Sequence, residues 1–456
     1  MNIAMISEHA SPLAALGGAD SGGQNVYVAQ VASELGRRGN RVVVFTRRDD
    51  PGLPDELDCG DNVRLVHVEA GPPRPVRKEE LLPFMAEFRR NVSAWLDGSP
   101  IDFDLVHAHF FMSGLVADEL REARGLPYVI TFHALGKVRR RHQGTADTFP
   151  DERFEIEERV ARNAAAVIAE CDQDFHDLQG LYGAPAERIR TVPCGFSTRE
   201  FGPLPQAQAR QRLSLPTDEP VILQLGRMVR RKGVEEVIRG LSRLVHDYRQ
   251  RALLVVVGGE SPEPDPVRTP ELGRLMGIAR EEGVEELVRF EGQRDRRHLR
   301  DYYCAADVFV STPWYEPFGI TPLEAMACGV PVLGSAVGGL KSTVVDGETG
   351  FLVPPRNPEA IAERLAVMLR EPKILARMRE RALARAGEYT WQRVTDLLED
   401  VYEEALGRSA LPVPAIVASR DRVPGGTFRA AASPTIAATI PVTSSRDASE
   451  PEGGSR

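Results

Sequence analysis

The sequence has few of the features that mark secreted, membrane-spanning or zinc-binding proteins. Its 456 residues contain five cysteines, and no two of them form a CxxC pair. Scattered, odd-numbered cysteines are typical of reduced thiols, not of a disulfide framework or a zinc site. No apolar run reaches the length of a membrane span, and the N-terminus lacks the basic-then-apolar pattern of a secretion signal. We therefore expect a cytoplasmic protein without a membrane span.

An excess of basic residues is also absent. The 57 lysines and arginines are outnumbered by 66 aspartates and glutamates, which gives a net charge of −9 at pH 7. This balance argues against a nucleic-acid partner, because nucleic-acid-binding proteins usually carry a basic excess or stripe. With 42% hydrophobic and 27% charged residues, the composition is that of a globular protein long enough for two or three domains.

Short β-rich runs alternate with longer amphipathic segments along most of the chain. Alternation of this kind predicts parallel sheets with helices on both faces. The first series of expected strands covers residues 2–7, 41–47, 63–70, 104–110, 127–133, 165–171 and 189–195. The second series covers residues 221–227, 252–259, 287–293, 307–312 and 331–336.

Two doubly wound α/β domains joined by a linker are the simplest interpretation of this pattern. We expect an N-terminal domain at 1–202, a polar, proline-punctuated linker at 203–220 and a C-terminal domain at 221–390. From 408 to 456 the chain is rich in Ala, Ser, Pro and Gly and lacks periodicity, which predicts a disordered tail. Ligands bind at the carboxyl ends of the strands in such sheets, so two facing domains would offer a cleft.

A glycine-rich loop separates the first expected strand from the first expected helix. The stretch HASPLAALGGADSGGQNVYV contains Gly17, Gly18, Gly22 and Gly23, but neither a GxGxxG fingerprint nor a P-loop. Glycines let the backbone approach a ligand, and the helix N-terminus that follows attracts anions. The alternative is an ordinary flexible loop between a strand and a helix.

The segment EPFGITPLEAMACGVPV places Glu316 and Glu324 eight residues apart. Thr321, a following proline and Glu324 match a capping box, which predicts a helix that begins near Thr321. In that case Glu324 is a capping residue and Glu316 a solvated loop acid. The amides of Gly319, Ile320 and Thr321 would also be available to an anion. Together with the two carboxylates, they could hold a sugar, a diphosphate and a ribose.

The turn LGRMVRRKG ends the first strand of the expected second domain. Arg227 and Lys232 follow the carboxyl end of this strand and could supply a planar fork and a point charge to one diphosphate. The alternative is a solvated basic turn, which is the interpretation we give to Arg230 and Arg231.

His133 follows the expected strand PYVITF, at a position where either a packing residue or a ligand-facing residue can lie. The run Arg139–Arg141 after it is either a solvated face or an attractant for an anionic acceptor. We interpret His107 and His109 as structural, because no third ligand stands at metal spacing.

These motifs, in this order, resemble the retaining glycosyltransferases of family 4, which have the GT-B architecture. The resemblance covers residues 1–407, and its most specific part is the pair Glu316 and Glu324 in EPFGITPLEAMACGVPVLGS. It implies two Rossmann-like domains that face a cleft. The segment TWQRVTDLLEDVYEEAL is similar to the family's closing helix, so residues 391–407 are expected to return to the first domain.

The resemblance also implies roles for individual residues. His133, Glu316, Arg227 and Lys232 are the expected catalytic residues, with His133 beside the reacting sugar. The expected donor-binding residues are Gly22, Gly23, Arg227, Lys232, Glu316, Phe318, Gly319, Ile320, Thr321 and Glu324. The expected acceptor-binding residues are His9, Asn25, Lys78, Lys137 and Arg153.

Retaining members of this kind are thought to react on one face of the sugar. The leaving phosphate accepts the proton of the incoming hydroxyl, so no enzymic nucleophile and no cofactor are implied. Preorganised cations and helix-end amides stabilise the charge that develops on the leaving group, as a metal does elsewhere. Two DxD matches, at 102–104 and 172–174, lie outside donor-like segments, and we expect no metal site.

The glycine loop is similar to that of a branch that contains sucrose-phosphate synthases and D-inositol 3-phosphate glycosyltransferase. Lys78 fits a phosphate-binding lysine of the latter, whereas Phe110 and Ala134 stand where that enzyme uses a tyrosine and a threonine. The expected reaction transfers a sugar from a UDP-linked donor to a small hydrophilic acceptor, such as a phosphorylated sugar or polyol. Alternatives are a transferase like sucrose-phosphate synthase or mannosylfructose-phosphate synthase, a nucleotide-sugar epimerase, and a non-catalytic binding module.

Overall fold

The computed structural model describes residues 1–13 and 22–408. Gly17 and Gly18 of the glycine loop, and the predicted tail from residue 409 onward, lie outside the described residues.

The first sheet has eight strands in the order β3-β4-β2-β1-β5-β6-β7-β8. Seven of them match the expected strands and pair in parallel. The sequence missed β3, an exposed edge strand of three residues that pairs antiparallel with β4, because three residues are too few to show a period. The strands are β1 (Asn2–Ile6), β2 (Arg41–Arg47), β3 (Glu56–Asp58), β4 (Val63–Val68), β5 (Leu105–His109), β6 (Tyr128–Thr131), β7 (Ala166–Ala169) and β8 (Ile189–Thr191).

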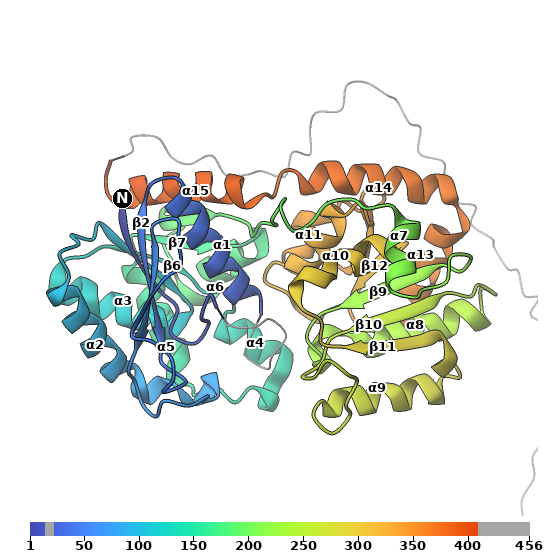
Figure 1. The fold of residues 1–456 in the computed structure, drawn as a ribbon, viewed down its shortest axis with the longest axis horizontal. Coiled ribbons are helices and arrows are strands. Elements are labelled where there is room, and N and C mark those ends of the chain that lie inside the picture. Colours follow the sequence, from blue (N-terminus) through green and yellow to red (C-terminus); the bar gives the residue numbers. More distant parts are fainter. Residues whose placement is uncertain (14–21, 409–456) are drawn as a thin grey trace, which may run out of the picture. The chain divides into compact units, whose positions relative to one another are not determined.

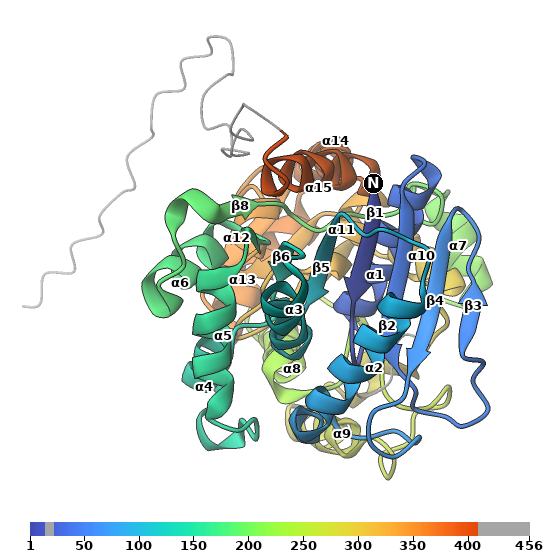
Figure 2. The ribbon, with the colours of Figure 1, turned by 90° about the vertical axis from the view of Figure 1, so that its left-hand side faces the viewer.

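Helices cover both faces of this sheet, as Figure 2 shows for α2, α3 and α5 on one of them. Ile3 and Met5 of β1 pack in a cluster with α1, whereas Ala4 and Ile6 pack with α2 and α3. Because alternate residues point to opposite faces, a sheet buried on both sides needs apolar residues at nearly every position. The helices are α1 (Gly23–Arg37), α2 (Met85–Gly98), α3 (Phe111–Arg124), α4 (Gly136–Gln143), α5 (Glu152–Asn163) and α6 (Asp172–Tyr182), with short 3-10 turns at Lys78–Glu80, Leu82–Phe84, Gly144–Ala146 and Ala186–Arg188.

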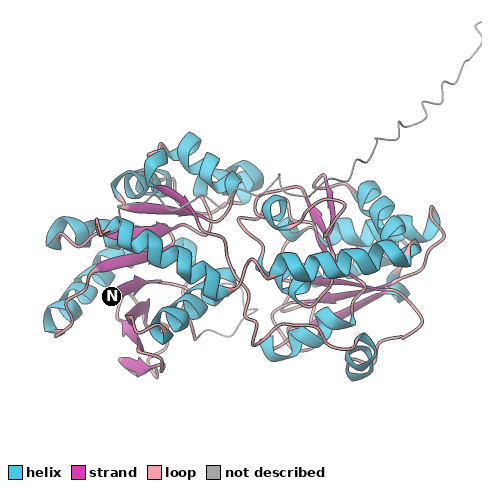
Figure 3. Cartoon of the chain, turned by 90° about the horizontal axis from the view of Figure 1, so that it is seen from above, coloured by secondary structure: helices cyan, strands magenta, loops and turns pink. Residues whose placement is uncertain are grey.

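The second sheet has six parallel strands in the order β11-β10-β9-β12-β13-β14, enclosed by helices (Figure 3). The expected strands of this domain are present, and β14 is an additional edge strand of four residues. The strands are β9 (Val221–Leu225), β10 (Leu253–Val257), β11 (Val288–Gly292), β12 (Val308–Ser311), β13 (Val332–Ser335) and β14 (Gly350–Val353). The helices are α8 (Val234–His246), α9 (Pro270–Glu281), α10 (Arg296–Ala305), α11 (Ile320–Ala327), α12 (Leu340–Thr343), α13 (Pro358–Arg370) and α14 (Pro372–Ala386), with 3-10 turns at Arg230–Lys232 and Glu285–Leu287. The predicted pair of doubly wound α/β sheets is therefore confirmed.

The segment predicted as a linker contains a helix, α7 (Gln206–Arg212), which packs against α10. The Arg210 guanidinium lies 2.6 Å from Asp307 Oδ2, and the same oxygen accepts a hydrogen bond from the Val221 amide at the start of β9. This segment is thus attached to the second sheet by buried charge pairing, which the proline-punctuated sequence does not reveal.

The helix α15 (Trp391–Ala405) returns to the first sheet, where it lies beside α1 (Figure 1). Arg38 Nη1, just after α1, lies 2.7 Å from a carboxylate oxygen of both Asp396 and Glu399. The Tyr402 hydroxyl of α15 is within hydrogen-bond distance of His107 Nδ1 on β5.

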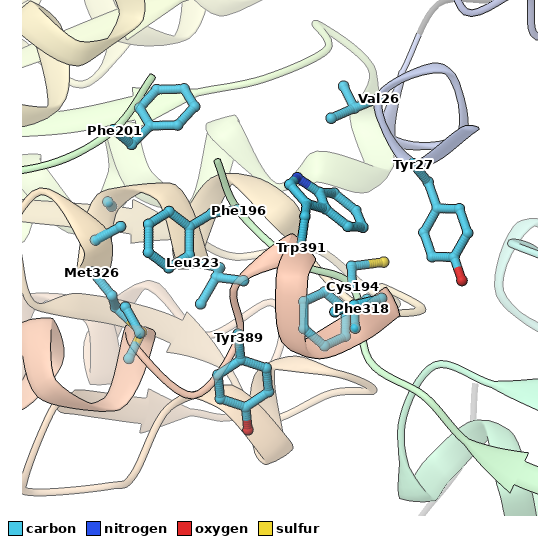
Figure 4. Close-up of a cluster of buried hydrophobic side chains, with 14 of the residues drawn as sticks. Val26, Tyr27, Cys194, Phe196, Phe201, Phe318, Leu323, Met326, Tyr389 and Trp391 are labelled. Carbon is cyan, nitrogen blue, oxygen red and sulfur yellow. The ribbon is translucent and has the colours of Figure 1, made fainter. Parts of the chain in front are cut away.

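Trp391 begins α15 and is fully buried at the point where residues of both sheets meet. Figure 4 shows its ring among Val26 and Tyr27 of α1 and the side chains of Phe196 and Phe318. The Trp391 and Tyr27 rings are 5.5 Å apart and perpendicular, an arrangement that aromatic quadrupoles favour. One apolar core therefore includes residues on α1, on the segment after β8 and on α11.

Candidate active site

The carboxyl ends of strands from both sheets meet at one cavity of about 310 Å³. In both sheets the strand order reverses beside the first strand, between β1 and β5 and between β9 and β12, which is where such folds bind ligands. Of the predicted site residues, the following line the cavity: His9, Gly22, Gly23, Asn25, Lys78, His133, Arg153, Arg227, Lys232, Glu316, Phe318, Gly319, Ile320, Thr321 and Glu324.

The N-terminus of α1 faces residues of the second sheet across this cavity. A β-carbon placed on Gly22 would lie 3.9 Å from Arg227 Cδ, and one on Gly23 would lie 3.5 Å from Ile320 Cδ1. The Asn25 side chain accepts a hydrogen bond from the Gly22 amide and donates one to a loop carbonyl, each at 2.9 Å. These bonds hold the turn that brings the partly positive end of α1 to the cavity.

Lys232 and Glu316 form a mostly buried ion pair through Nζ and Oε2 on the second-sheet side. Burial acts to raise the pKa of Glu316, but the charges of Lys232, Arg231 and Arg227 outweigh it, so the pKa is lowered. Burial also lowers the pKa of Lys232, although the negative charge of Glu316 acts to raise it. The arrangement keeps a carboxylate ionised beside a group of cations.

The helix that contains Glu324 begins at Ile320, after Gly319 with φ 95°, a conformation that favours glycine. The predicted capping box is wrong, because the Glu324 side chain turns away from the helix end and into the protein. Tyr303 donates its hydroxyl hydrogen to Glu324 Oε2 at 2.8 Å, and Arg296 Nη1 lies 2.8 Å from Oε1. Burial raises the pKa of Glu324, and Arg296 and Tyr303 oppose this rise.

A second glycine shapes the loop that carries Glu316. Gly338 has φ 43°, and a β-carbon there would lie 1.8 Å from the Glu316 carbonyl oxygen. A larger residue at this position would therefore push the Glu316 loop out of place.

His133 belongs to a buried group of three histidines at the ends of β5 and β6. Its Nε2 lies 3.0 Å from His109 Nδ1, and the two rings stack with centroids 5.3 Å apart. His107 bonds Tyr402 and Thr131 at 2.6 and 2.9 Å. Burial lowers the pKa of His107 to about 3 and that of His109 well below its usual value, so both are neutral.

His109 is thus in contact with a cavity residue, which the purely structural interpretation missed. The signal was the alternation in His-Ala-His, which puts both imidazoles on one face of β5 at its carboxyl end. His133 itself has φ 57° and Phe110 has φ 79°. Left-handed conformations are costly for such residues, and strain of this kind gathers at functional sites.

Glu170 is a cavity residue that the sequence analysis did not identify. It follows β7 directly, is 4% exposed, and its Oε1 lies 3.2 Å from His133 Nδ1 and 3.0 Å from Cys194 Sγ. Its position after the carboxyl end of a strand was the available signal.

Basic side chains line the part of the cavity that belongs to the first sheet. Lys78, Arg139 and Arg153 lie there with Phe110 and Ala134. Arg153 is fully buried, with Nε 2.7 Å from a Glu157 oxygen and Nη2 bonded to the Ala134 carbonyl. Its Nη1 has no hydrogen-bond partner among the described residues. A buried guanidinium with an unsatisfied donor is suited to an anionic ligand.

Lys137 does not line this cavity, so the structure does not support its expected contact with an acceptor. Its ammonium pairs with Glu158, donates to the Leu181 carbonyl at 2.7 Å and lies 5.0 Å from the centre of the Tyr182 ring. The side chain lies on the face of α4 that packs on α5 and α6, whereas Arg139, two residues later, lies toward the cavity.

Across residues 1–13 and 22–408, no group of three or more His, Cys, Asp or Glu side chains is arranged to hold a metal ion. In the same part of the chain, every helix is too short or too polar to cross a membrane.

Comparisons with known proteins identify the family of the chain. Residues 21–200 match Glycosyltransferase Family 4, and residues 205–385 match Glycosyl transferases group 1. D-inositol 3-phosphate glycosyltransferase 1 of Catenulispora acidiphila is 38% identical over 410 residues, which cover 89% of this chain and 96% of that protein.

Solved structures show the same architecture. Sucrose-phosphate synthase from Thermosynechococcus elongatus superposes with a TM-score of 0.82 at 33% identity, over 90% of this chain and all of that chain. Anabaena HepE in complex with UDP-glucose is similar in fold, with a TM-score of 0.68 at 19% identity over 88% of this chain and 98% of that one. The chain belongs to glycosyltransferase family 4 and is a glycosyltransferase with the GT-B fold.

Proposed function

We propose that this protein transfers a sugar, with retention of anomeric configuration, from a UDP-linked donor to a small phosphorylated sugar or polyol. The observation that carries the proposal is the cavity of about 310 Å³ to which both sheets contribute. It combines Arg227 and the pair Lys232 and Glu316 of the second sheet with the N-terminus of α1 and a basic pocket on the side of the first sheet.

The donor diphosphate is assigned to the part of the cavity around Arg227 and Lys232. Breaking the bond to the sugar places negative charge on the leaving phosphate, and donors fixed in advance around that charge lower the barrier. Arg227, Lys232 and the amide groups that begin α1 can supply such donors without a metal ion. Glu316, held ionised by Lys232, can accept hydrogen bonds from the sugar hydroxyls.

His133 is assigned to the position beside the reacting sugar. With His133 protonated at Nδ1, Glu170 accepts a hydrogen bond from Nδ1–H, and His133 Nε2 accepts one from His109 Nδ1–H. The Glu170 carboxylate lies behind the imidazole. Its negative charge stabilises the positive charge that develops on the sugar ring. The leaving phosphate takes the proton of the acceptor hydroxyl, so the chain supplies no nucleophile.

The acceptor is assigned to the pocket that contains Lys78, Arg139 and Arg153. The names of two relatives, D-inositol 3-phosphate glycosyltransferase and sucrose-phosphate synthase, both include a phosphorylated compound. The unsatisfied Nη1 of Arg153 supports an anionic acceptor. The differences at Phe110 and Ala134 favour an acceptor other than D-inositol 3-phosphate, because two hydroxyl donors are missing from this pocket.

A donor and acceptor matrix tests the proposal. UDP-glucose and other UDP-, ADP- and GDP-sugars are incubated with the enzyme and with fructose 6-phosphate, glucose 6-phosphate or D-inositol 3-phosphate, and products are identified by mass spectrometry and NMR. The expected result is an α-linked phosphorylated disaccharide or glycosyl polyol from a UDP-α-sugar. Interconversion of the donor sugar without acceptor would instead show an epimerase, and binding without any turnover a non-catalytic module.

A further inference from the structure

Arg296 lies between two carboxylates at the end of the cavity where Glu324 is placed. It is the first residue of α10, and its Nη1 lies 2.8 Å from Glu324 Oε1. Its Nε pairs with Glu200, which follows β8, and its guanidinium lies 4.8 Å from the centre of the Phe201 ring. The side chain lines the cavity and is 18% exposed.

Arg296 is the positive charge that opposes protonation of Glu324. The carboxyl group is 1% exposed, and burial pushes its pKa upward, toward the protonated form. Arg296 is the cation that opposes this shift, while Tyr303 bonds the other oxygen. An ionised carboxylate can accept hydrogen bonds at both oxygens, whereas a protonated one loses acceptor capacity. Ribose hydroxyls donate hydrogen bonds, so the ionised form binds them more strongly than the protonated form.

Glu200 in turn fixes Arg296 and connects it to the first sheet. Glu200 Oε1 accepts a hydrogen bond from Gln30 Nε2 of α1 at 3.2 Å. A continuous series of polar contacts therefore runs from Gln30 through Glu200 and Arg296 to Glu324. Arg296 Nη2 is buried and has no partner among the described residues, which leaves a donor available beside Glu324.

We propose that Arg296 is a positioning residue for the nucleotide, one that holds the Glu324 carboxyl group in the orientation that accepts hydrogen bonds from ribose hydroxyls, and that Glu200 holds Arg296 in place. This inference rests on the proposed donor site. It assigns the recognition of the ribose to the pair of Glu324 and Arg296, not to Glu324 alone.

Binding of UDP, 2′-deoxy-UDP and 3′-deoxy-UDP is measured by isothermal titration calorimetry for the wild type, Arg296→Gln, Arg296→Lys and Glu200→Gln. Arg297→Gln is the matched control, because Arg297 is the next residue on α10 and is largely exposed. We expect the wild type and the control to lose about tenfold in affinity when a ribose hydroxyl is removed. Arg296→Gln should bind UDP about tenfold more weakly and no longer distinguish the deoxy nucleotides, and Glu200→Gln should show a smaller change in the same direction.

The pH dependence gives a readout that a merely structural residue would not change. The ionisable groups that face Glu324 are Arg296 and Tyr303 of α10, Glu200, and Cys328 after α11. In Arg296→Gln, UDP affinity relative to the wild type should fall further as the pH is lowered from 8.5 to 6, because Glu324 takes up a proton. Arg296→Lys, which keeps the positive charge, should restore most of the pH behaviour.

Thermal unfolding shows whether each variant is folded, and if Arg296→Gln is not, Glu200→Gln carries the test. Unchanged discrimination of the deoxy nucleotides by folded Arg296→Gln, or by Glu200→Gln in its place, would overturn the role of Arg296. A wild type that binds UDP without regard to its ribose hydroxyls would overturn it as well. If the wild type bound none of UDP, ADP and GDP, the proposed donor site would be wrong and this inference with it.

Discussion

His109 Nδ1 lies 3.0 Å from Nε2 of His133, while Nδ1 of His133 faces the Glu170 carboxyl group at 3.2 Å. These contacts give both ring nitrogens of His133 a protein partner. The Glu170 carboxylate can only accept a hydrogen bond, so it favours the tautomer of His133 that is protonated at Nδ1. The imidazole is therefore held in one orientation at the cavity wall before any ligand arrives.

Replacing Glu170 by glutamine should lower kcat by about 10- to 100-fold, because the negative charge behind His133 is lost and a neutral amide oxygen accepts a weaker hydrogen bond than a carboxylate. The dissociation constant for UDP should change by less than about threefold. Glu170 follows β7 of the first sheet, whereas Arg227 and Lys232 of the proposed diphosphate site follow β9 of the second. Steady-state kinetics and calorimetry check this. Glu158→Gln is the control, because Glu158 lies on α5 outside the cavity and pairs with Lys137, and a loss confined to the donor affinity would contradict the assignment.

Lys232→Ala should reduce kcat/KM by about 100-fold or more, because it removes a cation from the leaving phosphate and leaves Glu316 buried without its partner. Arg230→Ala is the control, since Arg230 is exposed in the same turn. Rates are measured with saturating acceptor. Similar rates for both variants would show that the diphosphate binds elsewhere.

The lowered pKa of Glu316 predicts a pH dependence of stability. A carboxyl group whose pKa is lower in the folded state stabilises the protein above its unfolded pKa, and this contribution is lost as the pH falls through the folded value. Glu316→Gln should therefore be destabilised at pH 7, by about 3 kcal/mol. The difference from the wild type should shrink as the pH falls below about 4.5. Urea unfolding at several pH values measures it, and a difference independent of pH would contradict the lowered pKa.

Lys78→Ala should raise the KM for a phosphorylated acceptor by about tenfold, because one charge-assisted hydrogen bond to the phosphate is removed. Lys137→Ala provides the control, since Lys137 is bound to Glu158 outside the cavity. Donor affinity should be unchanged in both variants. Equal effects of the two substitutions would place the acceptor near α5 and α6 instead.

Activity should be retained after treatment with EDTA, because the proposed charge stabilisation comes from Arg227, Lys232 and helix-end amides. Rates are compared before and after chelation and after addition of Mg²⁺ or Mn²⁺. Complete loss that a divalent ion restores would show that a metal takes part.

The sequence predicted those features that depend on local pattern. The strands that precede His133 and Arg227 are apolar runs bounded by polar turns. Such runs can be recognised from the sequence without a structure. The glycines at 22 and 23 and the spacing of Glu316 and Glu324 are likewise local. The domain boundaries and the disordered tail stay predictions.

Features that depend on contacts between distant segments were missed or misassigned. Glu324 matched a capping box in sequence, yet its partners, Tyr303 and Arg296, lie more than twenty residues earlier. Lys137 and Arg139 belong to the same basic run, but the orientation of α4 places one against α5 and the other at the cavity. Sequence spacing does not report which face of a helix meets a ligand.

The sequence alone determined the two α/β sheets, the family and fifteen of the residues that line the cavity, because periodicity and turn chemistry act over a few residues. Only the tertiary structure decided which charges pair: Lys232 with Glu316, Arg296 with Glu324 and Glu200, and Glu170 with His133. Those pairings depend on burial and on segments far apart in the chain, and they lower the pKa of Glu316 and oppose the rise in the pKa of Glu324.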